Sequence, residues 1–162
     1  MSRFGFSIDL PVRNDWRNVD VIRSSVQNCF SAVFIDLAGC HALSMVTGEL
    51  LENAIKYGHW RQREQVFRLR IAGDARHAQV VVENPALHES GHVERLQRAI
   101  EWIRSFPTPA DAYRARLREI ADLVDTGGTR QLGLVRVAYE GNGVLSAAYA
   151  SGIVTVTAEI DL

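Results

Sequence analysis

Hydrophobic residues recur along this chain with two different spacings, which mark the expected elements. Alternation is typical of strands, whereas spacings of three and four residues are typical of helices. Alternation predicts five strands, in the segments 3–10, 66–73, 77–84, 144–150 and 153–160. Helical spacing predicts five helices, in the segments 14–33, 45–58, 91–105, 109–125 and 132–140. Pro11 should end the first strand, and Gly39 should separate the first two helices.

The order of these elements predicts the fold class. A strand, two helices, two strands, three helices and two final strands are typical of an α+β protein. The expected architecture is a two-layer α/β sandwich, with helices packed on one face of a mixed sheet. The 162 residues suffice for one domain with a substantial core and are few for two. We therefore expect a single domain over residues 1–162.

Composition narrows the classes of function. The chain is 47% hydrophobic and 23% charged, with a formal net charge of −1, so its charge does not predict binding to nucleic acid or to an anionic membrane. No run approaches the roughly 18 apolar residues of a membrane span. Cys29 and Cys40 lack the spacing of a metal site, and we interpret them as reduced thiols, with a disulfide as the alternative. A soluble, cytoplasmic protein is expected.

The candidate chemistry lies in the stretch from Met45 to Gly58. On a helix its apolar residues share one line and predict a buried stripe: Leu43, Val46, Leu50, Ala54 and Tyr57. Glu49 and Asn53 lie one above the other on the flank of this stripe, and Lys56 projects from nearly the same flank. A carboxylate can accept a proton, and a carboxamide oxygen can ligate a hard cation. The alternative is an ordinary amphipathic helix with a polar edge.

The segment Glu49–Tyr57, ELLENAIKY, resembles the N-box of the GHKL ATPases, which include histidine kinases, anti-sigma factor kinases, gyrase and Hsp90 relatives. The resemblance implies a Bergerat-type, histidine kinase-like ATPase domain that uses ATP and Mg²⁺. It implies that Asn53 holds Mg²⁺ on the nucleotide phosphates and that Glu49 acts as the general base. Lys56 is then placed to contact the phosphates.

A second part of the family pattern is altered in this chain. Where the family has Asp-x-Gly-x-Gly to hold adenine, this chain has Val82–Ala86, VENPA. Without the glycines the backbone cannot make the same close turn against the base. Asn84 is the candidate for the adenine contact through its amide oxygen. The alternative is an asparagine that only ends a strand before Pro85.

The segment 127–135, GGTRQLGLV, resembles the second glycine-rich box of the same family, GxGLGL. In the family this loop cradles phosphates with backbone N–H groups. Arg130 and Gln131 interrupt it here. The resemblance implies that four residues of the segment bind the nucleotide: Gly128, Thr129, Gly133 and Leu134.

From about Leu43 to Leu162 the chain resembles the SiaB-family protein kinases, an offshoot of the anti-sigma kinases. The matching parts are Val82-x-Asn84, the two helices that follow, GGTRQLGLVRVA and the closing hairpin. The resemblance implies a bacterial partner-switching regulator that phosphorylates or captures a small protein. That partner would be an anti-sigma antagonist-like protein, a SiaC-like protein or a response regulator. Because anti-sigma relatives often dimerise, a homodimer stays open.

Two other interpretations compete with this one. His88–His92, HESGH, matches the HExxH signature of zinc hydrolases, in which both histidines share one helical face. Because Pro85 precedes it and Gly91 lies within it, we expect a loop and a helix start there instead. The second alternative is a scaffold that keeps the fold and binds proteins without catalysis. The altered adenine box favours that scaffold, and the intact set of Glu49, Asn53 and Lys56 argues against it.

Overall fold

A computed structural model describes residues 5–33, 36–62, 65–124 and 132–162. The strands are β1 (Phe6–Arg13), β2 (Val66–Gly73), β3 (His77–Pro85), β4 (Gly143–Ala150) and β5 (Ile153–Asp161). The helices are α1 (Arg17–Ser31), α2 (Leu37–Tyr57), α3 (His92–Arg104), α4 (Pro109–Val124) and α5 (Gly133–Tyr139), and a short 3₁₀ helix, η1 (His88–Ser90), precedes α3. Each predicted strand and helix is present.

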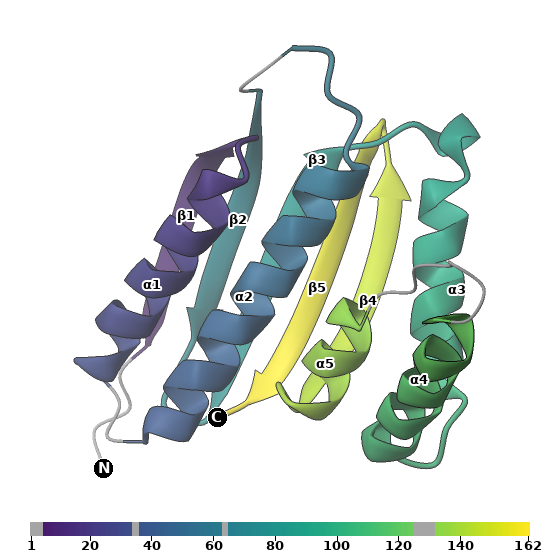
Figure 1. Cartoon of the computed structure of the whole chain (residues 1–162). Helices are drawn as coiled ribbons and strands as arrows, with labels where there is room; N and C mark the ends of the chain where they lie inside the picture. The colour runs from purple at the N-terminus through teal and green to yellow at the C-terminus, as the bar shows by residue number, and fades with distance from the viewer. Residues whose placement is uncertain (1–4, 34–35, 63–64, 125–131) are drawn as a thin grey trace.

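The strands form a sheet in the order β1-β2-β3-β5-β4 (Figure 1). Every strand pairing among the described residues is antiparallel, so the expectation of a mixed sheet is wrong. The reason lies in the connections. Between β1 and β2 the chain runs down through α1 and back up through α2, so β2 starts at the end of the sheet where β1 stopped. The other direct connections, β2 to β3 and β4 to β5, are hairpins.

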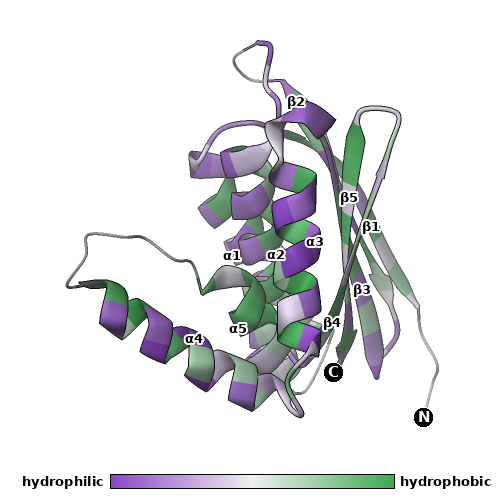
Figure 2. Cartoon of the chain, turned by 90° about the vertical axis from the view of Figure 1, so that its right-hand side faces the viewer, coloured by the Kyte–Doolittle hydropathy of each residue, from purple (hydrophilic) through white to green (hydrophobic). Residues whose placement is uncertain are grey.

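The helices cover one face of this sheet and leave the other face bare (Figure 2). Residues that point toward the helices alternate along the strands with residues that point away, as predicted: Phe67, Leu69 and Ile71 of β2 are buried. The outward-facing Arg68 and Arg70 instead pair with carboxylates of the neighbouring strands. The two-layer α/β sandwich expected from the element order is therefore confirmed.

Two local expectations are corrected by the structure. β1 continues through Pro11 to Arg13, because it is an edge strand, where a residue without an N–H group is tolerated. α2 begins at Leu37, so Gly39 lies in its first turn and does not separate two helices. Asp36 sets this start, since its carboxylate accepts a hydrogen bond of 2.9 Å from the backbone N–H of Ala38.

None of the helices that the structure describes is both long enough and apolar enough to cross a bilayer. The hydrophobic residues are instead buried between the helices and the sheet, where Leu43, Val46 and Leu50 of α2 face Leu69 and Val82 in a shared core. α2 runs along the middle of the helical layer, between α1 and α5 (Figure 1).

Candidate functional site

The site is built on the flank of α2. The predicted stripe is confirmed, because Leu43, Val46, Leu50 and Ala54 are each at most 3% exposed and Tyr57 is half-buried. This stripe fixes the rotation of the helix against the sheet. The flank that carries Glu49, Asn53 and Lys56 consequently faces the start of α5.

A cleft of about 480 Å³ lies between that flank and α5; we call it the polar cleft. Its lining comes from the turn before α1, from α2 and from α5: Trp16, Glu49, Glu52, Asn53, Lys56, Leu132, Gly133 and Arg136. Three residues predicted from the N-box and one from the second glycine-rich box thus meet in one place. Although the two boxes are about 80 residues apart in the sequence, α5 brings them together.

Glu49 is a buried carboxylate with an ion-pair partner. It is 9% exposed, and its Oε1 accepts a hydrogen bond of 2.6 Å from Nη1 of Arg136. Its other oxygen lies against Gly133, where a Cβ would be 2.6 Å from Oε2. Burial raises the pKa of Glu49, and the nearby Arg136 guanidinium opposes that rise only in part. The carboxylate is therefore more basic than an exposed one, but it is already engaged.

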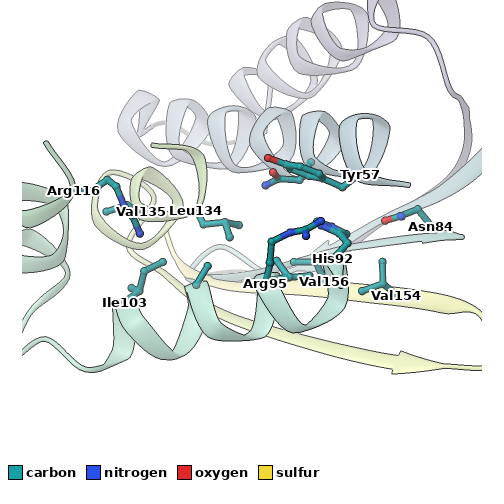
Figure 3. Close-up of a pocket in the computed structure, with 14 residues that line it drawn as sticks. Tyr57, Asn84, His92, Arg95, Ile103, Arg116, Leu134, Val135, Val154 and Val156 are labelled. Atoms are coloured by element: carbon teal, nitrogen blue, oxygen red, sulfur yellow. The ribbon is translucent and has the colours of Figure 1, made fainter. Parts of the chain in front are cut away.

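A second cavity, of about 320 Å³, adjoins the polar cleft; we call it the apolar slot. α2 and α3 form its walls and β5 contributes Val154 and Val156 (Figure 3). Asn84 lies at one end of this view and Arg116 at the other. The lining is mostly apolar with a few polar groups, which is the usual character of small-molecule sites.

An aromatic pair crosses the apolar slot between its two helical walls. The rings of Tyr57 and His92 stack with centroids 4.3 Å apart and an angle of 16° between their planes (Figure 3). Burial lowers the pKa of His92, and the nearby charge of Arg95 adds to the effect. Both effects favour the neutral form of the ring. A flat, neutral surface of this kind suits the stacking of a heterocyclic base.

Asn84 lines the apolar slot at the end of β3. It is 3% exposed, and its Nδ2 donates a hydrogen bond of 3.1 Å to the carbonyl oxygen of Pro85. The carboxamide oxygen is the acceptor that this side chain can present to a ligand. Asn84 also stands beside Pro85, the last residue of β3, and its contact with adenine stays a prediction.

Asn53 belongs to both cavities. It lines the polar cleft and the apolar slot, and within the part of the chain that the structure describes its buried Nδ2 has no hydrogen-bond partner. His92 and Arg116 also line the apolar slot. Nδ1 of His92 and Nε of Arg116 are likewise buried without a hydrogen-bond partner among the described residues. Buried polar groups are normally satisfied, so unpaired ones gathered around one cavity indicate a place for a ligand.

The structure brings most of the predicted site together. Glu49, Asn53, Lys56 and Gly133 line the polar cleft, and Asn84 and Leu134 line the apolar slot. Gly128 and Thr129 lie in the segment 125–131, outside the described residues.

Several residues of the site were missed by the sequence reasoning. Arg136 follows Gly133 by one helical turn, a spacing that places it on the same side of α5 and could have identified it. His92, Arg95 and Arg116 carry no comparable signal, because they come from α3 and α4 and meet the site only through the packing of those helices.

The HExxH match does not form a zinc-binding helix. His88 lies in η1, Gly91 has a left-handed backbone with φ of 66°, and His92 begins α3. The two histidines therefore do not share a helical face, as expected from Pro85 and Gly91. Among the described residues, no group of three or more histidine, cysteine, aspartate or glutamate side chains is arranged to hold a metal ion.

The fold has a counterpart among solved structures. It is similar to a chain in the crystal structure of the SiaB–SiaC complex from Pseudomonas aeruginosa, with a TM-score of 0.69. The two chains are 18% identical, and the similarity covers 96% of this chain and 89% of that chain. At this identity the likeness establishes a shared fold. No family model matches the sequence, and no curated protein matches it.

Proposed function

We propose that this protein binds Mg·ATP across the polar cleft and the apolar slot and serves as a partner-switching signalling regulator of the GHKL type. The observation that carries the proposal is the position of Asn53. Its carboxamide lines both cavities, and its nitrogen has no protein partner among the described residues. A ligand that places a polar group at the junction and an apolar ring in the slot fits this arrangement.

The residues present fit such a ligand. Asn53 would hold Mg²⁺ through its oxygen, and Lys56, which is exposed at the cleft, would contact phosphates. Gly133 lets the Glu49 carboxylate lie against the start of α5, because a Cβ there would be 2.6 Å from Oε2 of Glu49. Asn84 would accept a hydrogen bond from the adenine amino group. The metal would neutralise charge on the phosphates.

Glu49 would act as the proton acceptor for a serine or threonine hydroxyl of a partner protein. Its buried position raises its pKa and makes it a better base than an exposed carboxylate. In the proposed transfer, the hydroxyl oxygen bonds to the γ-phosphorus, ADP departs with the bridging oxygen, and the proton passes to Glu49. Phosphoryl transfer depends mainly on alignment and charge neutralisation, so one positioned carboxylate suffices.

The proposed partner is a small regulatory protein. The similar chain belongs to a complex of two proteins, SiaB and SiaC, which supports assembly with a second protein as the setting of the activity. Two forms of the function remain distinct: phosphorylation of the partner, or its capture without transfer. Labelled ATP and a co-purified partner separate them, because only phosphorylation transfers label, and that transfer should disappear in Glu49→Ala.

Calorimetric titration with ATP tests the nucleotide-binding half of the proposal. We expect Asn53→Ala to weaken Mg·ATP binding at least about tenfold, since a metal-linked contact is lost. Asn28→Ala is the matched control, because Asn28 is exposed on α1 away from both cavities. Omitting Mg²⁺ should weaken binding to the wild-type protein and change little in Asn53→Ala. If ATP gives no binding, or binds Asn53→Ala as tightly as wild type, the nucleotide proposal is wrong.

A further inference from the structure

Arg136 connects two carboxylates at the wall of the polar cleft. Its Nη1 donates to Oε1 of Glu49 at 2.6 Å, while Nε and Nη2 donate to the two oxygens of Glu140 at 3.1 and 3.2 Å. Glu140 lies one turn further along the chain and holds one edge of the guanidinium. The remaining nitrogen, Nη1, is the one that reaches into the cleft.

The guanidinium keeps some capacity for another acceptor. Arginine has five N–H donors, and the three bonds to Glu49 and Glu140 use one donor each. The side chain of Arg136 is 37% exposed, whereas that of Glu49 is 11% exposed. A ligand in the cleft can therefore reach Arg136 more easily than it can reach Glu49.

The other charged residues of the polar cleft, Glu52 and Lys56, do not pair with Glu49 or Arg136 in the structure. Glu52 is held from the α1 side by Arg23, with 2.9 Å between Nη2 and Oε1. Lys56 takes part in no ion pair among the described residues and lies 5.2 Å from the ring centre of Tyr57. A phosphate that enters beside Glu49 would meet a like charge, and the guanidinium bonded to that carboxylate is a cation at the same place.

We propose that Arg136 recognises the terminal phosphate of the nucleotide. Its guanidinium would release Glu49 and bind the γ-phosphate instead, while Glu140 keeps its hydrogen bonds to the Nε and Nη2 edge of the guanidinium. The inference rests on the proposed function and adds selection of a triphosphate over a diphosphate. It also explains why Glu49 is engaged in this structure. With Arg136 on the phosphate, the carboxylate becomes free to orient a hydroxyl. Arginine suits this exchange, because its planar fork binds carboxylate and phosphate in similar geometry.

If Arg136 has a purely structural role, its loss should change nucleotide affinities in a different way. If the residue only fastens α5 to α2, its loss should weaken the binding of every nucleotide equally. A phosphate reader should instead change the ratio between triphosphate and diphosphate affinities. That ratio is insensitive to a general loosening of the site, because both ligands share the base, the ribose and the first two phosphates.

The experiment is calorimetric titration of the full chain with the β,γ-imido analogue of ATP and with ADP, each with Mg²⁺. We expect wild type to prefer the triphosphate about tenfold, since a charge-assisted hydrogen bond is added. Arg136→Gln should bring the two affinities within about twofold of each other, and Arg136→Lys should keep part of the preference. Glu49→Gln should raise triphosphate affinity about threefold, because the competing carboxylate is gone.

Arg68→Gln is the matched control, since it removes an arginine–aspartate pair on the opposite face of the sheet. It should leave the ratio unchanged. If wild type binds both nucleotides and Arg136→Gln keeps the wild-type ratio or weakens both ligands equally, the inference fails while the proposed function stands. If wild type binds neither nucleotide, the proposed function fails and the inference fails with it.

Discussion

At the residue scale, Glu49 is a carboxylate whose burial lowers the stability of the fold. A carboxylate at 9% exposure loses most of its hydration, and one contact with Arg136 does not fully compensate, because burial still raises its pKa. The folded protein therefore holds the ionised form less favourably than the unfolded chain does. A buried carboxylate that destabilises the fold is typical of a site where a reaction needs a basic group.

Glu49→Gln should therefore stabilise the fold. Because folding raises the pKa of Glu49, the ionised carboxylate destabilises the folded protein. This destabilisation is absent in acid, where the group is protonated. It appears as the pH rises above the unfolded pKa of about 4.3 and is complete above the folded pKa. At pH 7 we expect a gain of about 1 kcal/mol, or about 2–4 °C in melting temperature, shrinking toward zero near pH 4. Thermal unfolding across this pH range measures it.

Glu101→Gln provides the control for this measurement. Glu101 is exposed on α3, so its substitution should change stability by less than about 0.5 kcal/mol at any of these pH values. A melting temperature for Glu49→Gln that is below wild type at pH 7, or an advantage that does not shrink in acid, would contradict the assignment of a strained carboxylate.

At the element scale, the contact between α2 and the end of α5 positions the polar cleft. Gly141 follows α5, and a Cβ there would lie 2.5 Å from Cγ2 of Val46 and 2.7 Å from the carbonyl oxygen of Val137. The second neighbour is backbone and cannot rotate away. This close packing keeps Arg136 within reach of Glu49, since both belong to the two helices that meet here.

Gly141→Ala should destabilise the protein by about 2 kcal/mol, because the added methyl group overpacks this contact. Gly39→Ala is the matched variant. It lies inside α2, where a Cβ would meet Leu162 at an ordinary 3.7 Å, so alanine should stabilise by up to about 1 kcal/mol through helix propensity. Urea unfolding measures both. Equal stability of Gly141→Ala and wild type would show that α5 is not held closely against α2.

The elements also show what the sequence could predict. Local periodicity was enough to find the five strands and five α-helices of the described residues, although not the 3₁₀ helix η1, and the N-box spacing was enough to place Glu49 and Asn53 together. The antiparallel direction of all described strand pairs, and the pairing of Glu49 with a residue 87 positions away, depend on tertiary packing. The spacing of Arg136 from Gly133 could have placed it on the same side of α5, but local patterns do not show that it pairs with Glu49.

At the scale of the whole molecule, the two-layer architecture explains where a ligand and a partner can approach. The helices lie on one face of the sheet and leave the other bare (Figure 2). The lining of both cavities includes helical residues, while the bare face carries ion pairs between strands, such as Arg68 with Asp9. The polar cleft opens beside Trp16, a residue that is 54% exposed. Under the proposed function, a partner that receives a phosphoryl group would approach the helical layer next to the start of α1.

The proposed function requires one nucleotide to occupy both cavities with its phosphates at Asn53. A crystal structure of the protein with the β,γ-imido analogue of ATP and Mg²⁺ would show whether it does. We expect density for the base in the apolar slot near Asn84, with the metal on Asn53 and the phosphates between Lys56 and Gly133. A nucleotide bound elsewhere, or two cavities that stay empty at saturating ligand, would show that the proposed function is wrong.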